Sequence, residues 1–249
     1  MNNTKVSVYV INLPKSFERK KFMEEQLNSH GITAHFVSAV NGYEMSESDI
    51  ESVFDEKLCI DKLGRKLSRG EIGCYLSHFS VYQIFISDEN AEWALILEDD
   101  VFLKEEFYDF FKSINKMPKD IEYLNFANFP DSSFFFKTKN RINKFKIKEH
   151  VAGVWGTYAY LISRSAADKL IQQALPIHMP IDYLGRVYGT KLDCLVVHPY
   201  CAYTEVDQIH GSLKFPSTIG LGRSMSEKKK RWISAFAYRI KVFVKRFGF

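Results

Sequence analysis

Apolar and polar residues alternate in a way that predicts a strand, a helix and a second strand at the start of the chain. Residues 5–13 alternate towards an apolar core strand, and a proline and a serine interrupt the pattern before a helix over residues 18–29. A glycine ends that helix, and residues 34–40 form a second strand pattern that an Asn-Gly dipeptide closes. This order predicts a β-α-β unit with a parallel sheet and with sites at the carboxyl ends of its strands.

A long helix is predicted in the middle of the chain. Residues 46–66, which precede it, are polar and acid-rich and predict a short helix and a mobile connection. The helix begins at Ser68, which Glu71 can cap reciprocally. Its predicted core stripe comprises Ile72, Tyr75, Leu76, Phe79, Tyr82 and Ile86, with Ser77 and His78 just off the stripe. A single histidine in such a place is typical of a hydrogen-bonded helix residue.

The next predicted strand ends in three acids. Residues 94–97 are apolar, which predicts a strand buried on both faces, and Glu98, Asp99 and Asp100 follow them. Neighbouring carboxylates repel one another, so a cation or hydrogen-bond donors should compensate them. Side chains alternate along a strand, so Glu98 and Asp100 can share one Mg²⁺ or Mn²⁺ ion while Asp99 points to the other side. The alternatives are a solvated turn cluster or a helix capped by Asp99 or Asp100.

Strands and helices also alternate in the second half of the chain. The pattern predicts helices over residues 104–114 and 166–174 and strands over residues 121–126, 154–163 and 192–197. Residues 129–149 suit either a hairpin with its turn near Asn140 and aromatic residues that line an acceptor site, or core strands with solvated lysines. Two prolines frame Asp182, and residues 203–222 are turn-rich. The pattern as a whole predicts an α/β fold.

Positive charge is concentrated at the end of the chain. The net charge is +4, but residues 227–249 carry eight Lys or Arg and one Glu, a net of +7, which leaves −3 for the rest. An apolar stripe in this segment comprises Trp232, Ile233, Phe236, Ile240, Phe243, Val244 and Phe247. We therefore expect a domain over residues 1–222 and a basic amphipathic tail over residues 223–249, of which residues 228–249 bind an anionic membrane. A terminal helix packed on the domain is the alternative, and no other basic surface favours nucleic acid.

Cysteine usage and hydropathy predict the compartment. The four cysteines form no C-x-x-C pair, so we interpret them as reduced packing residues of a cytosolic chain without a zinc site. The amino terminus has no signal-peptide pattern, and no run approaches the ~20 apolar residues of a membrane-spanning helix. These features predict a cytoplasmic protein, peripheral on a membrane through its tail.

Five sequence blocks follow one another in a specific order. They are Val10-Ile11-Asn12-Leu13 with Glu18-Arg19, Ser38-Ala39-Val40-Asn41-Gly42, Gly70-Glu71-Ile72-Gly73-Cys74-Tyr75-Leu76-Ser77-His78, residues 95–101, and Trp155-Gly156-Thr157 through Ile162-Ser163-Arg164. Together they resemble glycosyltransferase family 25, which includes bacterial lipooligosaccharide biosynthesis transferases and the collagen galactosyltransferases. The resemblance spans residues 5–222. It implies a GT-A-like, Rossmann-type nucleotide-sugar-binding sheet flanked by helices.

The resemblance also implies the substrates. The donor would be a UDP-sugar, typically UDP-galactose and sometimes UDP-glucose, and the acceptor a glycan in the lipooligosaccharide or lipopolysaccharide core. Such a protein would lie on the inner face of a bacterial inner membrane. The donor sugar, the acceptor residue, the linkage and the oligomeric state stay open.

Site roles follow from the same resemblance. Glu98 and Asp100 would hold Mn²⁺ or Mg²⁺ as the family's E-x-D motif, with Asp99 near the ribose or behind the metal ligands. The predicted nucleotide and donor contacts are Asn12, Leu13, Arg19, Asn41, Ser77 and His78. His210 is a further candidate metal ligand without a secure motif match. From the residues alone, Arg19 and the two lysines after it could receive a phosphate or form a solvated helix face.

An inverting transfer needs a base for the acceptor hydroxyl, and a carboxylate is the usual one. Asp182 occupies the family's Pro-x-Asp position, and Glu205 and Asp207 are its competitors. Two other functions stay open at this stage. A sugar nucleotidyltransferase would use a similar nucleotide site but expects a Gly-rich amino-terminal loop, which this chain lacks. A non-catalytic, membrane-associated carbohydrate-binding protein is the second.

Overall fold

Helices and strands alternate along most of the chain. The computed structural model describes residues 5–127, 136–150, 156–183, 192 and 194–204. In order, its elements are β1 (Val6–Asn12), α1 (Phe17–Asn28), β2 (His35–Ser38), α2 (Glu47–Val53), α3 (Glu56–Leu63), α4 (Arg69–Ser87), β3 (Trp93–Glu98), β4 (Phe102–Leu103), α5 (Glu105–Phe111), η1 (Ile114–Lys116), β5 (Tyr123–Asn125), β6 (Phe136–Ile142), β7 (Phe145–His150), β8 (Ala159–Ser163), α6 (Arg164–Ile171), η3 (Ile181–Tyr183), β9 (Cys194–His198) and β10 (Ala202–Tyr203).

Eight of the strands form one sheet, in the order β2-β1-β3-β8-β5-β9-β7-β6, and β10 pairs with β4. Strand β1 runs parallel to both β2 and β3, which confirms the predicted β-α-β unit. However, β8 runs antiparallel between β3 and β5, and the β6–β7 hairpin is antiparallel too. The expectation of a parallel sheet is therefore wrong beyond the first three strands and the β5–β9 pair. An apolar run of this kind is buried in either direction, so its pattern does not reveal strand direction.

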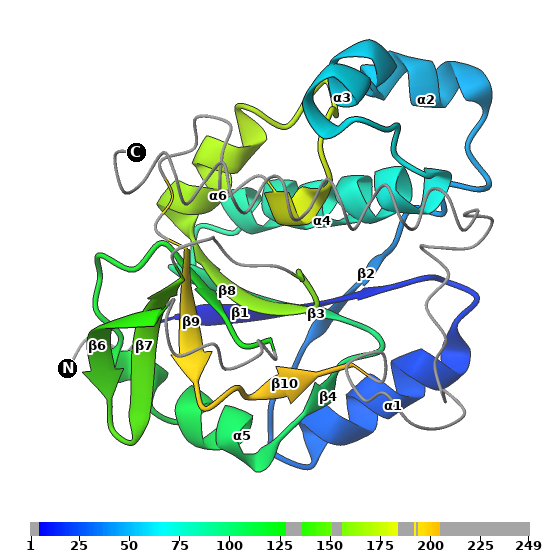
Figure 1. Cartoon of the computed structure of the whole chain (residues 1–249). Coiled ribbons are helices and arrows are strands. Elements are labelled where there is room, and N and C mark those ends of the chain that lie inside the picture. Colours follow the sequence, from blue (N-terminus) through cyan, green and yellow to red (C-terminus); the bar gives the residue numbers. More distant parts are fainter. Residues whose placement is uncertain (1–4, 128–135, 151–155, 184–191, 193, 205–249) are drawn as a thin grey trace, which may run out of the picture.

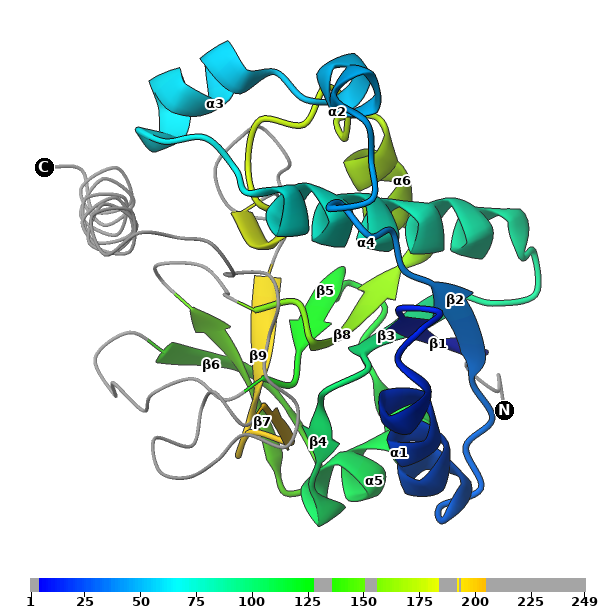
Figure 2. The ribbon, with the colours of Figure 1, turned by 90° about the vertical axis from the view of Figure 1, so that its right-hand side faces the viewer.

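The sheet lies between two layers of helices, as Figures 1 and 2 show. Helices α4 and α6 cover one face, and α2 and α3 lie beyond α4 and contribute to the same core (Figures 1 and 2). Helices α1 and α5 bury apolar residues against the other face. Strand β3 illustrates the alternation, because Ala94 and Ile96 join the first core and Leu95 and Leu97 the second. Both faces of β3 are buried, as the sequence predicts, and the α/β class is confirmed.

Helix α4 is the long predicted helix, and it begins as expected. Ser68 caps it, and Glu71 completes the reciprocal capping box. The predicted stripe is only partly correct, because Ser77 and His78 are buried whereas Leu76, Phe79 and Ile86 are half-buried. Helix α4 packs on β1, β2, α6 and η3, so more than one of its faces is covered. A stripe calculation assumes one covered face, which is why it placed His78 outside the core.

Two further expectations need correction. Residues 46–66 form two helices, α2 and α3, capped by Ser46 and Asp55. The hairpin is confirmed, but its turn lies at Asn143, which has a φ of 51°, rather than near Asn140. Asparagine tolerates this left-handed conformation better than most residues.

Several sequence-based candidates lie outside the described residues. These are Glu205, Asp207, His210 and the whole tail over residues 223–249. Within the part of the chain that the structure describes, no helix combines the length and apolarity needed to cross a membrane.

Candidate functional site

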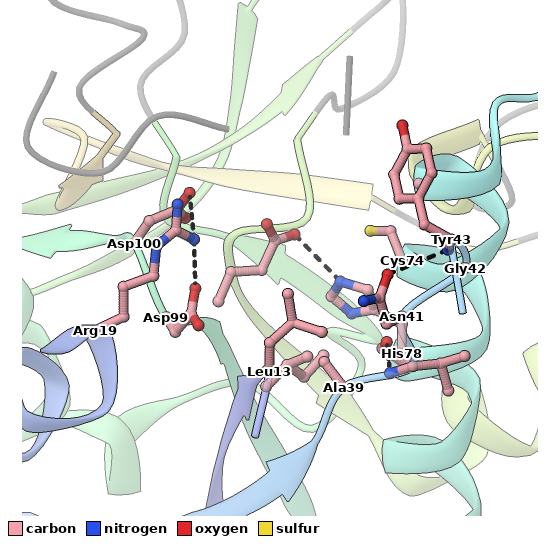
Figure 3. Close-up of a pocket in the computed structure, with 15 residues that line it drawn as sticks. Leu13, Arg19, Ala39, Asn41, Gly42, Tyr43, Cys74, His78, Asp99 and Asp100 are labelled. Carbon is pink, nitrogen blue, oxygen red and sulfur yellow. Dashed lines mark hydrogen bonds and ion pairs between the residues drawn. The ribbon is translucent and has the colours of Figure 1, made fainter. Parts of the chain in front are cut away.

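A pocket opens where β1, β2 and β3 end, and it is the main candidate site (Figure 3). The register pairs Ile11 with Glu98 and Asn12 with Ser38, so the three carboxyl ends lie side by side. The pocket is partly open to solvent. It is lined by Ile11, Leu13, Arg19, Ala39, Val40, Asn41, Gly42, Tyr43, Gly70, Cys74, Ser77, His78, Glu98, Asp99 and Asp100.

Asp99 is fully supported by its neighbours. Its two carboxylate oxygens accept hydrogen bonds from Asn12 Nδ2 at 2.7 Å and from Arg19 Nη1 at 2.8 Å. Asn12 also donates to Ser16 O, so its amide is held by protein on both sides. Asp99 was expected to point away from Asp100, but Arg19 Nη1 contacts both acids. The alternation rule fails here because β3 ends at Glu98 and residues 99–100 form a turn.

Asp100, by contrast, is only partly compensated. Its Oδ2 atom lies 3.3 Å from Arg19 Nη1, whereas its Oδ1 atom is buried without a hydrogen-bond partner among the described residues. Burial, followed by the charge of Glu98, raises the pKa of Asp100 to about 7. A partly buried carboxylate with one buried, unpaired oxygen fits a site that receives a cation.

Glu98 is linked to a buried chain of polar groups. Its Oε1 atom accepts a hydrogen bond from Thr157 Oγ1 at 3.1 Å and lies 3.2 Å from His78 Nε2. His78 Nδ1 lies 2.8 Å from the Tyr160 hydroxyl, which in turn lies 2.8 Å from that of Tyr82. Because β8 is antiparallel to β3, it starts at the edge where β3 ends, which brings Thr157 to Glu98. This series of hydrogen-bonded side chains connects the pocket with the core of the protein.

Close backbone packing joins the loop after β2 to helix α4. A Cβ atom at Gly73 would lie 2.6 Å from both Gly42 N and Val40 O, so only glycine fits there. Ser77 Oγ accepts a hydrogen bond from Val40 N at 2.9 Å and donates one to Gly73 O at 2.7 Å. Ser77 lines the pocket as predicted, but both of these contacts are to backbone. This close packing explains the glycines at positions 42 and 73, which lie in two of the five sequence blocks.

The other predicted residues are distributed around the pocket. Leu13 and Asn41 line it, and the Asn41 side chain accepts a hydrogen bond from Tyr43 N. Of the basic cluster, Arg19 lines the pocket, whereas each of the two lysines after it pairs with a glutamate one turn along α1. Asp182 lies in η3, which packs on α4.

Cys74 was interpreted from the sequence as a packing residue, yet it lines the pocket. All four cysteines are described, and all are free thiols. Burial raises the pKa of the Cys74 thiol well above its usual value, and the charges of Glu98 and Asp182 add to the shift. Asp182 itself is not among the residues that line the pocket. Cys74 precedes His78 by four residues, a spacing that places both on one face of a helix and was visible in the sequence.

Comparison with known proteins identifies relatives of the chain. The model of the family described as "Glycosyltransferase family 25 (LPS biosynthesis protein)" matches residues 5–185. Procollagen galactosyltransferase 1-B of Xenopus laevis is 30% identical over 211 residues, which cover 79% of this chain and 32% of the relative. Procollagen galactosyltransferase 2 of Homo sapiens is 28% identical, with 80% and 32% covered.

A bacterial relative is similar over a larger share of its own length. The lipooligosaccharide biosynthesis protein lic2B of Haemophilus influenzae is 30% identical over 173 residues, which cover 65% of this chain and 61% of lic2B. The chain thus spans about a third of the procollagen galactosyltransferases and less than two thirds of lic2B. The family match covers most of the chain, including β1 to β8 and the whole lining of the pocket, and so the chain belongs to glycosyltransferase family 25.

Proposed function

We propose that this protein transfers a hexose, galactose from UDP-galactose, onto a glycan with inversion at the anomeric carbon. The pocket at the ends of β1, β2 and β3 is the proposed donor site, and Glu98 with Asp100 would hold a Mn²⁺ or Mg²⁺ ion there. The names of the relatives support galactose as the sugar, since two of them are galactosyltransferases. UDP as the carrier is supported by the family resemblance.

The observation that carries the proposal is the unpaired oxygen of Asp100. Two acids, Glu98 and Asp100, close the end of a buried strand, and one Asp100 oxygen is buried without a partner in the described chain. Hard divalent ions bind such oxygen ligands, and when bound they neutralise the charge that develops on a departing diphosphate. Asp99 is supported by Asn12 and Arg19, so it would fix the turn that presents Asp100.

The remaining roles concern charge and protons. Arg19 is a fixed cation at the edge of the pocket, so it would attract the diphosphate of the donor. The acceptor hydroxyl oxygen would attack the anomeric carbon as the bond to the UDP oxygen breaks. Asp182, on η3 beside α4, would take the hydroxyl proton. Leu13, Asn41 and His78 would contact the nucleotide or the sugar.

The bacterial relative supports a proposal for the acceptor and the place of action. A lipooligosaccharide biosynthesis protein is 30% identical, which supports a core glycan of lipooligosaccharide or lipopolysaccharide as the acceptor. The protein would act at the cytoplasmic face of a bacterial inner membrane, where the basic tail over residues 228–249 would bind anionic lipid. We propose His210, in the segment before the tail, as a third metal ligand.

A panel of UDP-sugars tests this function directly. We expect slow UDP release from UDP-galactose, dependent on Mn²⁺ or Mg²⁺ and abolished both by a chelator and by Asp100→Ala. Faster release on addition of a lipooligosaccharide acceptor identifies the transferase. Pyrophosphate release from UTP and a sugar phosphate would identify a nucleotidyltransferase instead, and no turnover with any donor would support a binding protein.

The base is tested separately. Asp182→Ala should keep the affinity for UDP near that of the unchanged protein and lower kcat by about 10²–10⁴-fold, because only proton removal is lost. Asp168→Ala, which removes an exposed acid on α6, is the matched control and should leave kcat unchanged. If Asp182→Ala retained most of its kcat, another residue would be the base, with Glu205 and Asp207 next in line.

A further inference from the structure

Three potential metal ligands of different chemistry meet at one end of the pocket. Cys74 Sγ, a ring nitrogen of His78 and a carboxylate oxygen of Glu98 all lie within 4.8 Å of one another. Cys74 and His78 are one turn apart on α4, and Glu98 ends β3, so two rigid elements present the ligands. Figure 3 shows the side chains of Cys74 and His78 on the side of the pocket opposite Arg19 and Asp100.

This ligand set differs from the acid pair in the ion it prefers. A thiolate and an imidazole favour Zn²⁺ or Co²⁺ over Mn²⁺ and Mg²⁺, which prefer oxygen ligands. Three protein ligands with access to a pocket leave a fourth position for water or a substrate oxygen, as in zinc sites that are not purely structural. Helical spacing of four residues fixes Cys74 relative to His78 before any ion arrives.

The partners of His78 suit a metal ligand. The nitrogen that faces Glu98 is Nε2, whereas Nδ1 lies against Tyr160. An ion on Nε2 requires the ring proton on Nδ1, where it can be donated to the Tyr160 hydroxyl, and Tyr160 can donate to Tyr82. Without an ion, the same two tyrosines can donate in the opposite direction while Nε2–H faces Glu98. The buried tyrosine pair therefore accommodates both states.

We infer that Cys74, His78 and Glu98 form a binding site for a thiophilic divalent cation, Zn²⁺ or Co²⁺, separate in chemistry from the acid pair but sharing Glu98 with it. Binding of this ion does not depend on the proposed transferase function. If that function is correct as well, the shared carboxylate has a consequence: Zn²⁺ at this site withdraws Glu98 from the Mn²⁺ or Mg²⁺ site and inhibits transfer.

Direct binding of Co²⁺ and Zn²⁺ to the full chain without nucleotide tests the inference. We expect Co²⁺ to produce a thiolate charge-transfer band in the near ultraviolet and visible bands of tetrahedral intensity, and Zn²⁺ to abolish them by displacement. Cys74→Ser should remove the charge-transfer band and weaken Zn²⁺ binding at least about tenfold. Cys194→Ser is the matched control, because Cys194 is a half-buried cysteine on β9 that does not belong to the inferred site, and it should change neither the band nor Zn²⁺ binding.

A second variant tests the role of the tyrosine. Tyr160→Phe removes the hydroxyl that accepts the hydrogen bond from His78 Nδ1–H. It should weaken Zn²⁺ binding by about 10–100-fold. Thermal melts of each variant without metal show whether it is folded. No thiolate band in the unchanged protein, or an equal band in Cys74→Ser, would overturn the site. Inhibition of transfer by Zn²⁺ is measured relative to each variant's own rate with Mn²⁺. A protein that binds Zn²⁺ but shows no transfer would disprove the proposed function and leave the inferred zinc site standing.

Discussion

Asp99 and Asp100 are neighbours of the same residue type, but they differ in how many of their carboxylate oxygens have hydrogen-bond partners. Asp99 accepts hydrogen bonds from Asn12 and Arg19, and its pocket position is fixed by them. Asp100 shares only Arg19, and one of its oxygens is buried without a partner among the described residues. A buried charge without compensation destabilises the fold, so its presence is best explained by a ligand that completes it.

Removing that charge should therefore stabilise the metal-free protein. With the pKa of Asp100 raised to about 7, the folded state holds more protons than the unfolded state between pH of about 4 and 7, so stability falls as pH rises through this window. We expect Asp100→Asn to gain about 1–3 kcal/mol at pH 8 with a chelator present, which raises Tm by several degrees, and to gain little at pH 4.

Asp99→Asn is the matched control for this measurement. It loses charge-assisted bonds to Asn12 and Arg19, so its Tm should fall at pH 8. A fall in Tm for Asp100→Asn as well would show that the carboxylate is compensated in the folded protein, contrary to the unpaired oxygen seen here.

Side-chain roles were predictable where the signal was local and were missed where it was not. The acids after the apolar run were found from the local pattern and the pair Ser77-His78 from the family resemblance, and all of them line the pocket. That His78 is fully buried depends on Tyr160, which is 82 residues away in the chain. No local pattern contains such a contact, so the tyrosine pair received no role. Cys74 was interpreted as a packing residue although its four-residue spacing from His78 is a local signal.

At the scale of elements, the pocket depends on how tightly the loop after β2 packs on helix α4. Alanine normally stabilises a helix interior relative to glycine by about 1 kcal/mol. At Gly73 the added Cβ would instead lie 2.6 Å from two backbone atoms of residues 40 and 42. Backbone cannot rotate away as a side chain can, so the loop or the helix must shift.

We expect Gly73→Ala to cost about 1–3 kcal/mol in the free energy of unfolding, measured with urea, and to weaken UDP binding because Asn41 lies in the displaced loop. Gln83→Ala, at an exposed position of the same helix, tests the effect of alanine alone and should change stability by less than about 0.5 kcal/mol. A Gly73→Ala protein as stable as the unchanged one would mean that the loop moves freely off α4.

The same distinction applies to the helices and strands: features with a local cause were predicted, and features with a distant cause were missed. The capping box at Ser68 fixed the start of α4 correctly, since the signal lies within four residues. The direction of β8 was not predictable, because an apolar strand gives no sign of its neighbours. That direction matters for the site: it brings Thr157 to the edge where Glu98 lies.

On the scale of the whole molecule, two basic segments far from the pocket lining in the sequence can be compared. One is the β6–β7 hairpin at the edge of the sheet, where Lys137, Lys139 and Arg141 are exposed. Charged residues on an edge strand protect a sheet from pairing with other chains, which explains these cations without a ligand. The other is the segment over residues 227–249, which combines a net charge of +7 with an apolar stripe. The tail combines its charge with an amphipathic apolar stripe of the kind that enters a lipid interface.

This difference leads to a prediction about membrane binding. Replacing Lys228, Lys229 and Lys230 by glutamine should weaken binding to vesicles of phosphatidylglycerol and phosphatidylcholine by about 10–100-fold, because each basic residue near an anionic surface contributes about 1 kcal/mol. Replacing Lys137, Lys139 and Arg141 removes the same charge from the hairpin and should have a much smaller effect. Cosedimentation at low and high salt measures both. Equal losses for the two triple variants would mean that net charge alone, and not the tail, attracts the protein to lipid.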